Sequence, residues 1–359
     1  MFVTLDDVCE KGSSNLAQKD ILDLDGDFPI FGAAGYIGNV NFYHQEKPYL
    51  AVVKDGAGVG RVMLLPAKSS VIGTMQYIIP KEGIIVEYLY YAVKAMHLEK
   101  YYMGAAIPHI YFKDYKKEKL MLCSKIKQEQ IVARLDIIEK IINQHKQQLK
   151  NLEKFTKARF IEVFGESDKN TKQFPVRKLN EISSYWNGLT YKPVDTVEDG
   201  NGTLVLRSSN IQNGVLAFDD NVYVSCDIKE KLLVQDNDIL MCSRNGSAAL
   251  VGKTALIKGL VEPTTFGAFM MIIRSEYYSY LKTYFEMPFF RSQISTGTST
   301  INQITGKMLN EISLPVPDIG TVKVFEEFVN RIAKSKAVIE KSLKELETLQ
   351  ASLMQKYFS

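Results

Sequence analysis

Cysteine is scarce in this chain of 359 residues, and long apolar runs are missing. The four cysteines (Cys9, Cys123, Cys226 and Cys242) are widely scattered and form no Cys-x-x-Cys or Cys/His cluster, so no structural zinc site is predicted. We expect free thiols in a reducing cytosol. No apolar run approaches the roughly 20 residues of a membrane span. The first thirty residues carry seven acids instead of the basic start of an export signal, so we expect a cytoplasmic protein without membrane contacts.

An excess of charge of one sign is also lacking. Lys and Arg number 44 against 41 Asp and Glu, and the net charge of +3 does not by itself indicate a nucleic-acid-binding protein. Segment 100–127 differs, because it holds seven lysines against two acids, with five aromatic residues between them. Such a segment either lines DNA phosphates or forms a solvated face with its aromatic rings in the core. The pattern favours neither interpretation.

The signatures of common enzymes are missing as well. Gly56, Gly58 and Gly60 lie between two expected strands and do not open a helix, so they predict a hairpin turn and not a nucleotide site. The chain has no Gly-x4-Gly-Lys-Ser/Thr sequence, no Gly-x-Ser-x-Gly elbow, no His-Glu-x-x-His and no Asn-Pro-Pro-Tyr type motif of amino-methyltransferases. We therefore expect a binding protein with no catalytic residues and no metal site.

What the chain does contain is two related halves. Segments 73–82, 107–110 and 120–122 align with segments 267–276, 301–304 and 314–316, each 194 positions later. The same offset continues to Phe164 and Phe358. Unrelated segments would not hold one register for so long, so the sequence predicts a duplicated unit. Pseudo-symmetric molecules of this kind often read pseudo-symmetric targets.

Each half ends in a heptad pattern that predicts a helix of about 35 residues, or roughly 50 Å. The apolar seam consists of Ile131, Leu135, Ile138, Ile142, Leu149 and Leu152 in the first half, and Phe325, Val329, Ile332, Ile339, Leu343, Leu346 and Leu353 in the second. The polar interruptions are His145, Thr156, Lys336 and Gln350. Neither helix can bury its seam alone, so we expect an antiparallel pair that acts as a spacer.

The rest of each half is expected to be mixed α/β with many short strands. Segment 49–53 reads as a strand, followed by a Gly-rich turn at 54–58 and a second strand. Segments 238–243, 244–247 and 250–254 repeat this strand, turn and strand in the second half. The outer segments, 1–45 and 175–235, match poorly. Such divergence is what two sites of different specificity on a common frame would look like.

Polar and basic residues gather in these turns and in neighbouring loops. Arg and Asn can pair bidentately with guanine and adenine edges, and Lys can contact phosphates. The alternative for each residue is ordinary turn chemistry and capping. The candidate DNA-binding residues are Lys54, Arg61, His109, Lys113, Tyr191, Lys192, Arg207, Ser208, Asn210, Arg244, Asn245, Ser247, Lys253, Thr298, Thr300 and Asn302.

Over essentially its whole length the chain resembles the specificity (S) subunit of Type I restriction-modification systems. The motifs that carry the resemblance lie at 28–32, 55–60 and 124–132 in the first half, and at 188–192, 207–214, 238–240, 297–299 and 312–317 in the second. Singly these motifs are weak, but their order and duplication are specific.

The resemblance implies an α+β fold with two mixed α/β target recognition domains (1–124 and 166–318), separated by two long antiparallel coiled-coil helices (125–165 and 319–359) with pseudo-two-fold symmetry. Each domain would read one half of a bipartite site in double-stranded DNA. The helices would set the gap between the half-sites and dock two modification (M) subunits. S-adenosylmethionine, ATP and Mg would belong to partner subunits, which in a restriction complex include two restriction (R) subunits.

Some residues depart from the family pattern. The glutamine at the start of the first helix is kept as Gln128, but Val322 takes its place in the second half, and Lys336 stands where the first half has Ile142. We expect two unequal docking sites for M subunits. Two other functions stay open: a single-chain enzyme that fuses DNA recognition to methylation or cleavage, and a coiled-coil scaffold without a nucleic-acid role.

Overall fold

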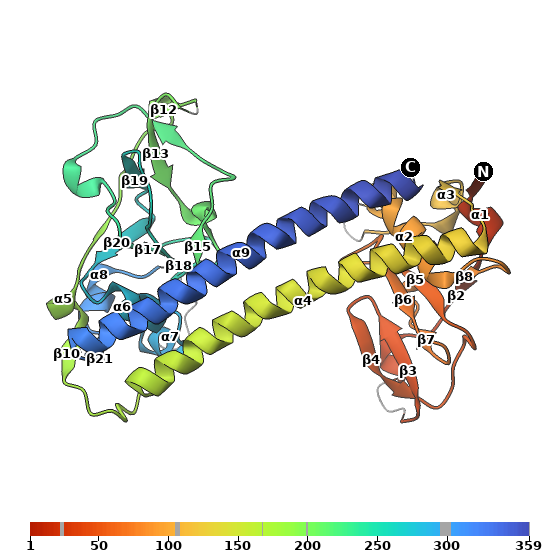
Figure 1. Ribbon diagram of the computed structural model, residues 1–359, viewed down its shortest axis with the longest axis horizontal. Coiled ribbons are helices and arrows are strands. Elements are labelled where there is room, and N and C mark those ends of the chain that lie inside the picture. The colour runs from red at the N-terminus through yellow and green to blue at the C-terminus, as the bar shows by residue number, and fades with distance from the viewer. Residues whose placement is uncertain (22–24, 105–107, 167, 199, 295–302, 359) are drawn as a thin grey trace. The chain divides into compact units, whose positions relative to one another are not determined.

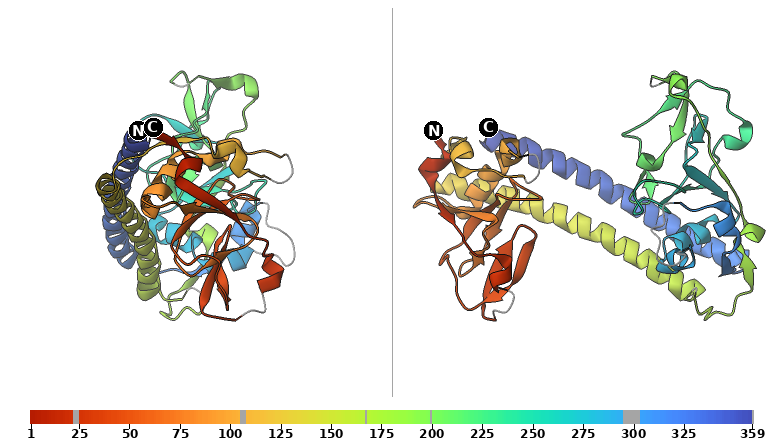
Figure 2. Two further views of the ribbon diagram at one scale, coloured as in Figure 1. Left: turned by 90° about the vertical axis from the view of Figure 1, so that its right-hand side faces the viewer. Right: turned by 180° about the vertical axis from the view of Figure 1, so that it is seen from behind.

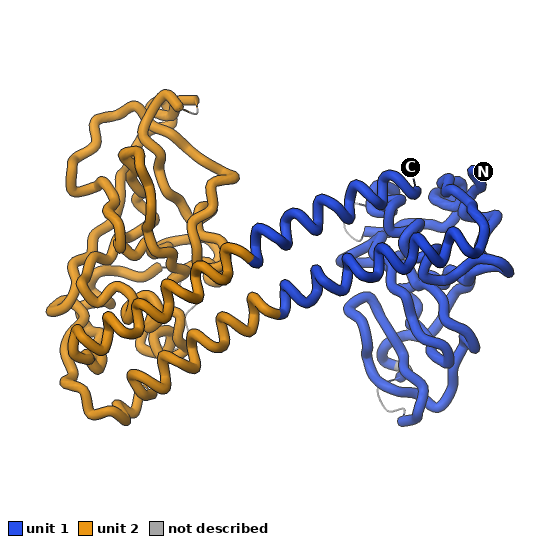
Figure 3. Tube along the Cα trace, in the orientation of Figure 1, with its two compact units in different colours: residues 1–147, 339–359 blue, residues 148–338 orange. Residues whose placement is uncertain are grey.

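The computed structural model describes residues 1–21, 25–104, 108–166, 168–198, 200–294 and 303–358. The chain divides into two compact units (Figure 3): unit 1 comprises residues 1–147 and 339–359, and unit 2 comprises residues 148–338. Within the described residues, no helix is both long enough and apolar enough to cross a membrane.

Two helices of 40 residues each, α4 (Lys125–Phe164) and α9 (Ile319–Phe358), contribute a segment to both units. Within each unit the two segments lie side by side in every view (Figures 1 and 2). In unit 1, Arg134 donates to the Tyr357 hydroxyl (3.1 Å) and Lys146 pairs with Glu347 (2.8 Å). The later residue of α4 thus contacts the earlier residue of α9, so the two segments of unit 1 are antiparallel, as predicted.

The predicted seam is the buried face of both helices. Ile131, Leu135, Ile138 and Ile142 are buried in unit 1, and every other seam residue is buried or half-buried. The α4 segment in unit 2 is anchored by aromatic rings, with the Phe160 ring 5.8 Å from Phe325 and 5.3 Å from Tyr280. Lys336 accommodates its charge by facing Glu153 at 3.8 Å.

Unit 1 is built on a four-stranded antiparallel sheet. Its strands are β2 (Cys9–Ser13), β8 (Met75–Pro80), β5 (Tyr49–Val53) and β6 (Val62–Leu65), in the order β2-β8-β5-β6. All five residues of β5 are buried, as expected for the central part of a sheet covered on both faces. On one face, Leu50, Val52 and Ile78 pack with Tyr88 and Leu89 of helix α2 (Val86–Ala95) in one core cluster.

Shorter elements complete unit 1. Strand β1 (Phe2–Thr4) pairs with β9 (Lys119–Met121), and the single-turn helix α1 (Leu5–Val8) follows β1. A three-stranded sheet has the order β4 (Gly35–Val40), β3 (Phe28–Gly32) and β7 (Ser70–Val71). Helix α3 (Phe112–Tyr115) precedes β9 and inserts two buried rings, Phe112 and Tyr115, into the core.

Unit 2 repeats this frame. Its main sheet has the order β11 (Ser184–Asn187), β20 (Met270–Arg274), β17 (Ile239–Cys242) and β18 (Thr254–Leu256), all antiparallel. Strand β10 (Val176–Lys178) pairs with β21 (Ser313–Pro315), and α5 (Leu179–Ile182) follows β10 as α1 follows β1. The helices α6 (Tyr278–Phe285), α7 (Pro288–Ile294) and α8 (Gly306–Asn310) come between β20 and β21.

The second sheet of unit 2 has four strands, where that of unit 1 has three. Its strand order is β12 (Thr196–Val197), β16 (Tyr223–Val224), β13 (Thr203–Leu206) and β19 (Thr264–Phe266). Between β13 and β16 in the chain, β14 (Ile211–Gln212) and β15 (Val215–Leu216) form a hairpin. The pair β13 and β19 is parallel, as is the pair β3 and β7 of unit 1.

The outer segments share elements between the two halves although their sequences match poorly. The sequence comparison found little similarity between 1–45 and 175–235, and we expected the two specificities to have diverged there. The structure gives β1, α1 and β2 the same order and pairing as β10, α5 and β11. These elements belong to the common frame, so the poor sequence match at 1–13 and 176–187 does not mark a difference in fold. Side-chain similarity is weak here because the frame is held by strand pairing through the backbone.

Candidate nucleic-acid interface

The Gly-rich turn of unit 1 joins β5 to β6, as the hairpin prediction expected. Gly56, Gly58 and Gly60 have φ values of +83°, +85° and +87°, a backbone conformation that favours glycine. A Cβ at Gly60 would lie 2.5 Å from the backbone nitrogen of Glu99. The glycines therefore serve a tight turn whose far end packs on neighbouring backbone.

Segment 108–113 is joined to this turn and brings three candidate residues together. Gly56 donates to the Pro108 carbonyl (2.9 Å), and Ile110 donates to the Lys54 carbonyl (3.0 Å). Between these bonds, the Asp55 carboxylate is hydrogen-bonded to Nδ1 of His109. Lys54, His109 and Lys113 thus share one edge of unit 1, and the exposed Arg61 ends the same turn.

Exposed aromatic and apolar side chains flank His109. The Tyr111 ring lies 3.9 Å from the His109 ring, and Lys113 Nζ lies 5.1 Å from the Tyr111 ring. Tyr102, Met103 and Tyr111 are each about half exposed or more. An exposed ring beside a lysine and an imidazole can stack on bases and contact phosphates.

Some lysines of segment 100–127 are paired with acids of unit 1, and others are free to contact DNA phosphates. Lys100 pairs with Glu118 (2.5 Å) and Lys116 pairs with Asp6 (2.8 Å), so these two charges are partly neutralised. The hydrogen bond to the same Glu118 carboxylate raises the pKa of Tyr101 to about 12. Lys113, Lys117 and Lys119 are exposed and pair with no described acid in the structure. Only part of the segment thus offers free positive charge.

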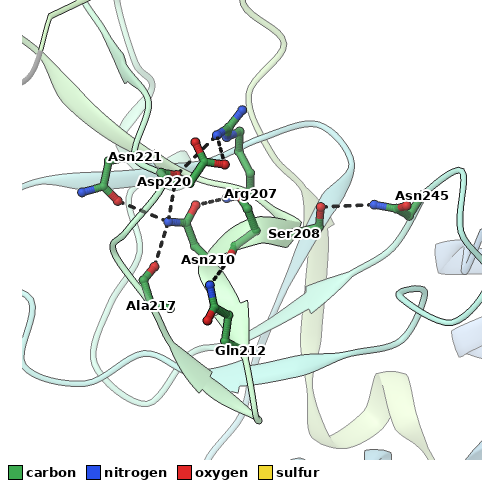
Figure 4. Close-up of polar contacts among 9 residues, drawn as sticks. Arg207, Ser208, Asn210, Gln212, Ala217, Asp220, Asn221 and Asn245 are labelled. Atoms are coloured by element: carbon green, nitrogen blue, oxygen red, sulfur yellow. Dashed lines mark hydrogen bonds and ion pairs between the residues drawn. The ribbon is translucent and has the colours of Figure 1, made fainter. Parts of the chain in front are cut away.

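In unit 2 the corresponding turn joins β17 to β18 and contacts the segment after β13 (Figure 4). The Asn245 amide donates to the Ser208 hydroxyl (3.1 Å), and Ser247 donates its backbone N–H to Asn245 (2.9 Å). Arg244 and Lys253, at the two ends of the turn, are exposed. The guanidinium of Arg244 lies 5.4 Å from the ring of Phe269, which is itself 61% exposed.

Asn210 is not a base-reading residue in this fold, and this candidate is corrected. Its side chain is fully buried, its oxygen accepts from Arg207 N (2.9 Å), and its nitrogen donates to the Ala217 carbonyl (2.9 Å) and to Asn221 (3.3 Å). Figure 4 shows these bonds closing the loop around it. The amide satisfies buried backbone groups, and exposing it to a base would leave them unpaired.

Arg207 is also engaged within the unit. Its guanidinium pairs with the Asp220 carboxylate at 2.9 Å and donates to the Asp220 carbonyl at 3.3 Å. A contact between Arg207 and DNA would have to share or replace this pair. Within the Arg207-Ser208-Ser209-Asn210 motif, Ser208 is the residue whose side chain is hydrogen-bonded to the turn that carries Arg244 and Asn245.

The remaining candidates fall outside these two clusters. Tyr191 is half-buried and Lys192 is exposed, and both lie in the loop that follows β11. Lys192 donates its backbone N–H to Asp195 (2.7 Å), which caps a short turn. Thr298, Thr300 and Asn302 lie outside the described residues.

Asp238, part of a motif shared with the resembled family, has a structural role. Arg274 donates to both of its carboxylate oxygens at 2.7 Å, and the guanidinium lies 5.0 Å from the Trp186 ring. The hydrogen bond from Arg274 to Asp238 raises the pKa of the guanidinium. The bond joins the start of β17 to the end of β20, so it stabilises the sheet that carries the turn.

Three residues near the clusters were not among the candidates: Asp55, Phe269 and Gln303. Asp55 forms an isolated bridge with His109, and Arg244 forms the same kind of bridge with Gln303. The alignment at offset 194 already pairs His109 with Gln303, so the sequence held a signal for Gln303. No sequence signal pointed to Phe269, because an aromatic residue within an apolar strand segment is expected to be part of the core. Within the described residues, no group of three or more His, Cys, Asp or Glu could hold a metal ion.

Comparison with known proteins agrees with the resemblance. Residues 1–154 match the family model of the Type I restriction modification DNA specificity domain. The chain is 27% identical over 157 residues to the specificity subunit of the Type I restriction enzyme StySPI from Salmonella potsdam. It is also 27% identical over 161 residues to that of EcoKI from Escherichia coli (strain K12). Each alignment covers 42% of this chain and 34% of the relative, so the match spans about a third of the length of these proteins.

The fold is similar over the full length to a solved structure. The S subunit of the Type I restriction-modification system from M. genitalium superposes with a TM-score of 0.65 at 16% identity, covering 100% of this chain and 96% of that one. The resemblance seen in the sequence is thus confirmed for residues 1–154 by the family model, and the α+β fold is confirmed for the whole chain.

Proposed function

We propose that this chain is the DNA specificity subunit of a Type I restriction-modification system, with one half-site read by each unit. One observation carries the proposal: the same frame occurs twice, and its equivalent turns present different side chains. Unit 1 presents Asp55 with His109, and unit 2 presents Arg244 with Gln303 at the same backbone bridge. Two readers of different sequence on one scaffold would have this construction.

The two helices supply the spacer in this proposal. Since α4 and α9 each extend over 40 residues, each is roughly 60 Å long. A stiff helix pair can fix the number of base pairs between two half-sites, which the sequence of the turns cannot do. The predicted domain limits, 1–124 and 166–318, are those that leave both helices outside the reading domains.

The outer faces of the helices are suited to binding two modification subunits. Large apolar side chains are exposed there, including Ile126, Ile137, Val324 and Val338. In unit 1 a groove beside α4 is lined by Tyr91, Asp136, Glu139, Lys140, Asn143, Gln144 and Gln147. Exposed apolar groups rimmed by polar ones are typical of protein interfaces.

In this proposal the catalytic reactions belong to the modification and restriction subunits. The modification subunits would bind S-adenosylmethionine and transfer the methyl group, and restriction subunits would use ATP and Mg. The low net charge of +3 fits this division, because partners would then provide much of the phosphate contact. The chain itself would select the sequence.

The proposal is tested by measuring DNA binding of the complex reconstituted with its modification subunits. We expect a small set of duplexes to be bound at least a thousandfold more tightly than random DNA, within the usual range for specific binding. Equal affinity for all duplexes at fixed salt would contradict the proposal. A complex with no affinity above background would favour a scaffold without a nucleic-acid role.

A further inference from the structure

His109 is held in place on both sides at the edge of unit 1. Its backbone exchanges two hydrogen bonds with Met103, both 3.0 Å long. On its other side, the bonds from Gly56 to Pro108 and from Ile110 to Lys54 hold it against the turn. The segment is therefore fixed on both sides, and the imidazole leaves it in a defined direction.

The partner of the imidazole decides which ring nitrogen carries the proton. An ionised carboxylate can only accept, so the hydrogen bond from Nδ1 of His109 to Asp55 places the proton on Nδ1. In the neutral ring Nε2 is then an acceptor. Within the described chain Nε2 has no hydrogen-bond partner, and the side chain is 25% exposed.

The same junction in unit 2 has the opposite chemistry. Arg244 occupies the place of Asp55 and Gln303 the place of His109, while Ile304 donates to the Ser243 carbonyl (2.7 Å) as Ile110 donates to Lys54. The backbone bond is kept and both side chains differ. If the junction served only to close the turn, no such change from acceptor to donor would be needed.

We propose that His109 is a specificity-determining residue for the first half-site and that Asp55 is its positioning residue. This inference rests on the function proposed above. The ligand is a base edge that offers an amino group: in the major groove, adenine N6 and cytosine N4 donate, whereas guanine and thymine present acceptors at those positions. Nε2 of His109 accepts from that amino group. Tyr111 and Lys113 flank His109. In this proposal the Tyr111 ring contacts a base or a sugar, and Lys113 contacts a phosphate.

The test uses the full chain in complex with its modification subunits. Duplexes carrying each of the four base pairs at each position of the first half-site are compared by competition binding. For the unaltered chain we expect one position that prefers an amino-bearing base by about tenfold. His109→Ala should remove this preference at that position alone.

Asp55→Asn separates positioning from contact. The amide can present either its oxygen or its nitrogen to Nδ1, so the ring is no longer held in one tautomer. Discrimination between amino-bearing and acceptor bases should fall several-fold at the same position, with little change in affinity for random DNA. Glu99→Gln is the matched control, because Glu99 faces His97 at 3.1 Å in an exposed pair of unit 1.

The results separate this inference from the proposed function. An unaltered complex without any sequence preference would refute the proposed function itself. A selective unaltered complex whose variants lose affinity equally for all bases would make the pair a structural clamp and overturn the inference. Unchanged discrimination in both variants would overturn it as well. His109→Gln, which places the unit 2 side chain at this junction, keeps the test decisive if the alanine variant does not fold.

Discussion

Arg274 lies between a buried carboxylate and an indole ring, and we expect it to contribute to the stability of unit 2. Asp238 is 1% exposed, so Arg274→Ala would leave a carboxylate without its partner in the core. We expect the free energy of unfolding to fall by about 2 to 3 kcal/mol, because Arg274 is itself a third exposed and water screens part of the pair. Urea unfolding measures the change. Arg177→Ala, which removes an exposed pair with Glu181, should cost below about 1 kcal/mol. Equal effects of the two variants would contradict this account.

The thiols differ in reactivity according to their burial. Burial raises the pKa of Cys9 to about 12 and also raises the pKa of Cys242. Both should stay protonated, and so unreactive, at pH 8, while the partly exposed Cys123 and Cys226 react with a thiol reagent. We expect two labelled cysteines per folded chain and four in denaturant, counted by mass spectrometry. Rapid labelling of Cys9 in the folded chain would show that its surroundings are open.

The residue types in the turns could be read from the sequence, but whether each side chain is exposed or already bonded within the protein could not. Asn210 and Arg244 both have side chains that can pair with bases, and both follow a strand. Only the folded chain distinguishes them, because Asn210 closes a loop through Ala217 and Asn221 while Arg244 stays exposed beside Phe269. Such contacts depend on how segments far apart in sequence meet.

At the scale of elements, the helix pair depends on aromatic packing in unit 2. Phe160 is fully buried and contacts Phe164, Tyr280 and Phe325. Phe160→Ala should cost about 3 to 5 kcal/mol, because the cavity cannot collapse among rigid rings. Phe155→Ala on the same helix is the matched control, since that ring is 53% exposed and packs mainly on Phe328. Its effect should stay within about 1 kcal/mol. Thermal unfolding followed by circular dichroism compares them, and a small effect at Phe160 would contradict the packing described.

The helices and the inner strands were the elements that the sequence predicted best. A heptad seam is a local signal, so the presence of α4 and α9 follows from spacing, although they are 40 residues long and not about 35. Strand β5, with five apolar residues between turn signals, was predicted at its observed limits. The pairing of β1 with β9 was not, because Phe2 and Met121 are far apart in sequence and carry no shared pattern. This pairing is what extends the common frame into the outer segments.

At the scale of the whole molecule, the duplication is the structural basis of the proposed function, in which one chain would hold two specificities. The frame of β2-β8-β5-β6 recurs as β11-β20-β17-β18, so each turn is presented on an equivalent edge. The two units then differ in the turns and in the segments 14–48 and 188–238. A change in one turn should alter one half-site and leave the other, and the gap, unchanged.

Mapping of methylated adenines tests this division most directly. The chain and its Arg244→Ala variant would each be expressed with the modification subunits in cells that lack other methylation systems. We predict one bipartite sequence with a fixed gap for the unaltered chain. For the variant, we predict altered or relaxed bases in a single half-site at the same gap. Methylation without sequence preference, or a variant that changes both half-sites alike, would contradict the account.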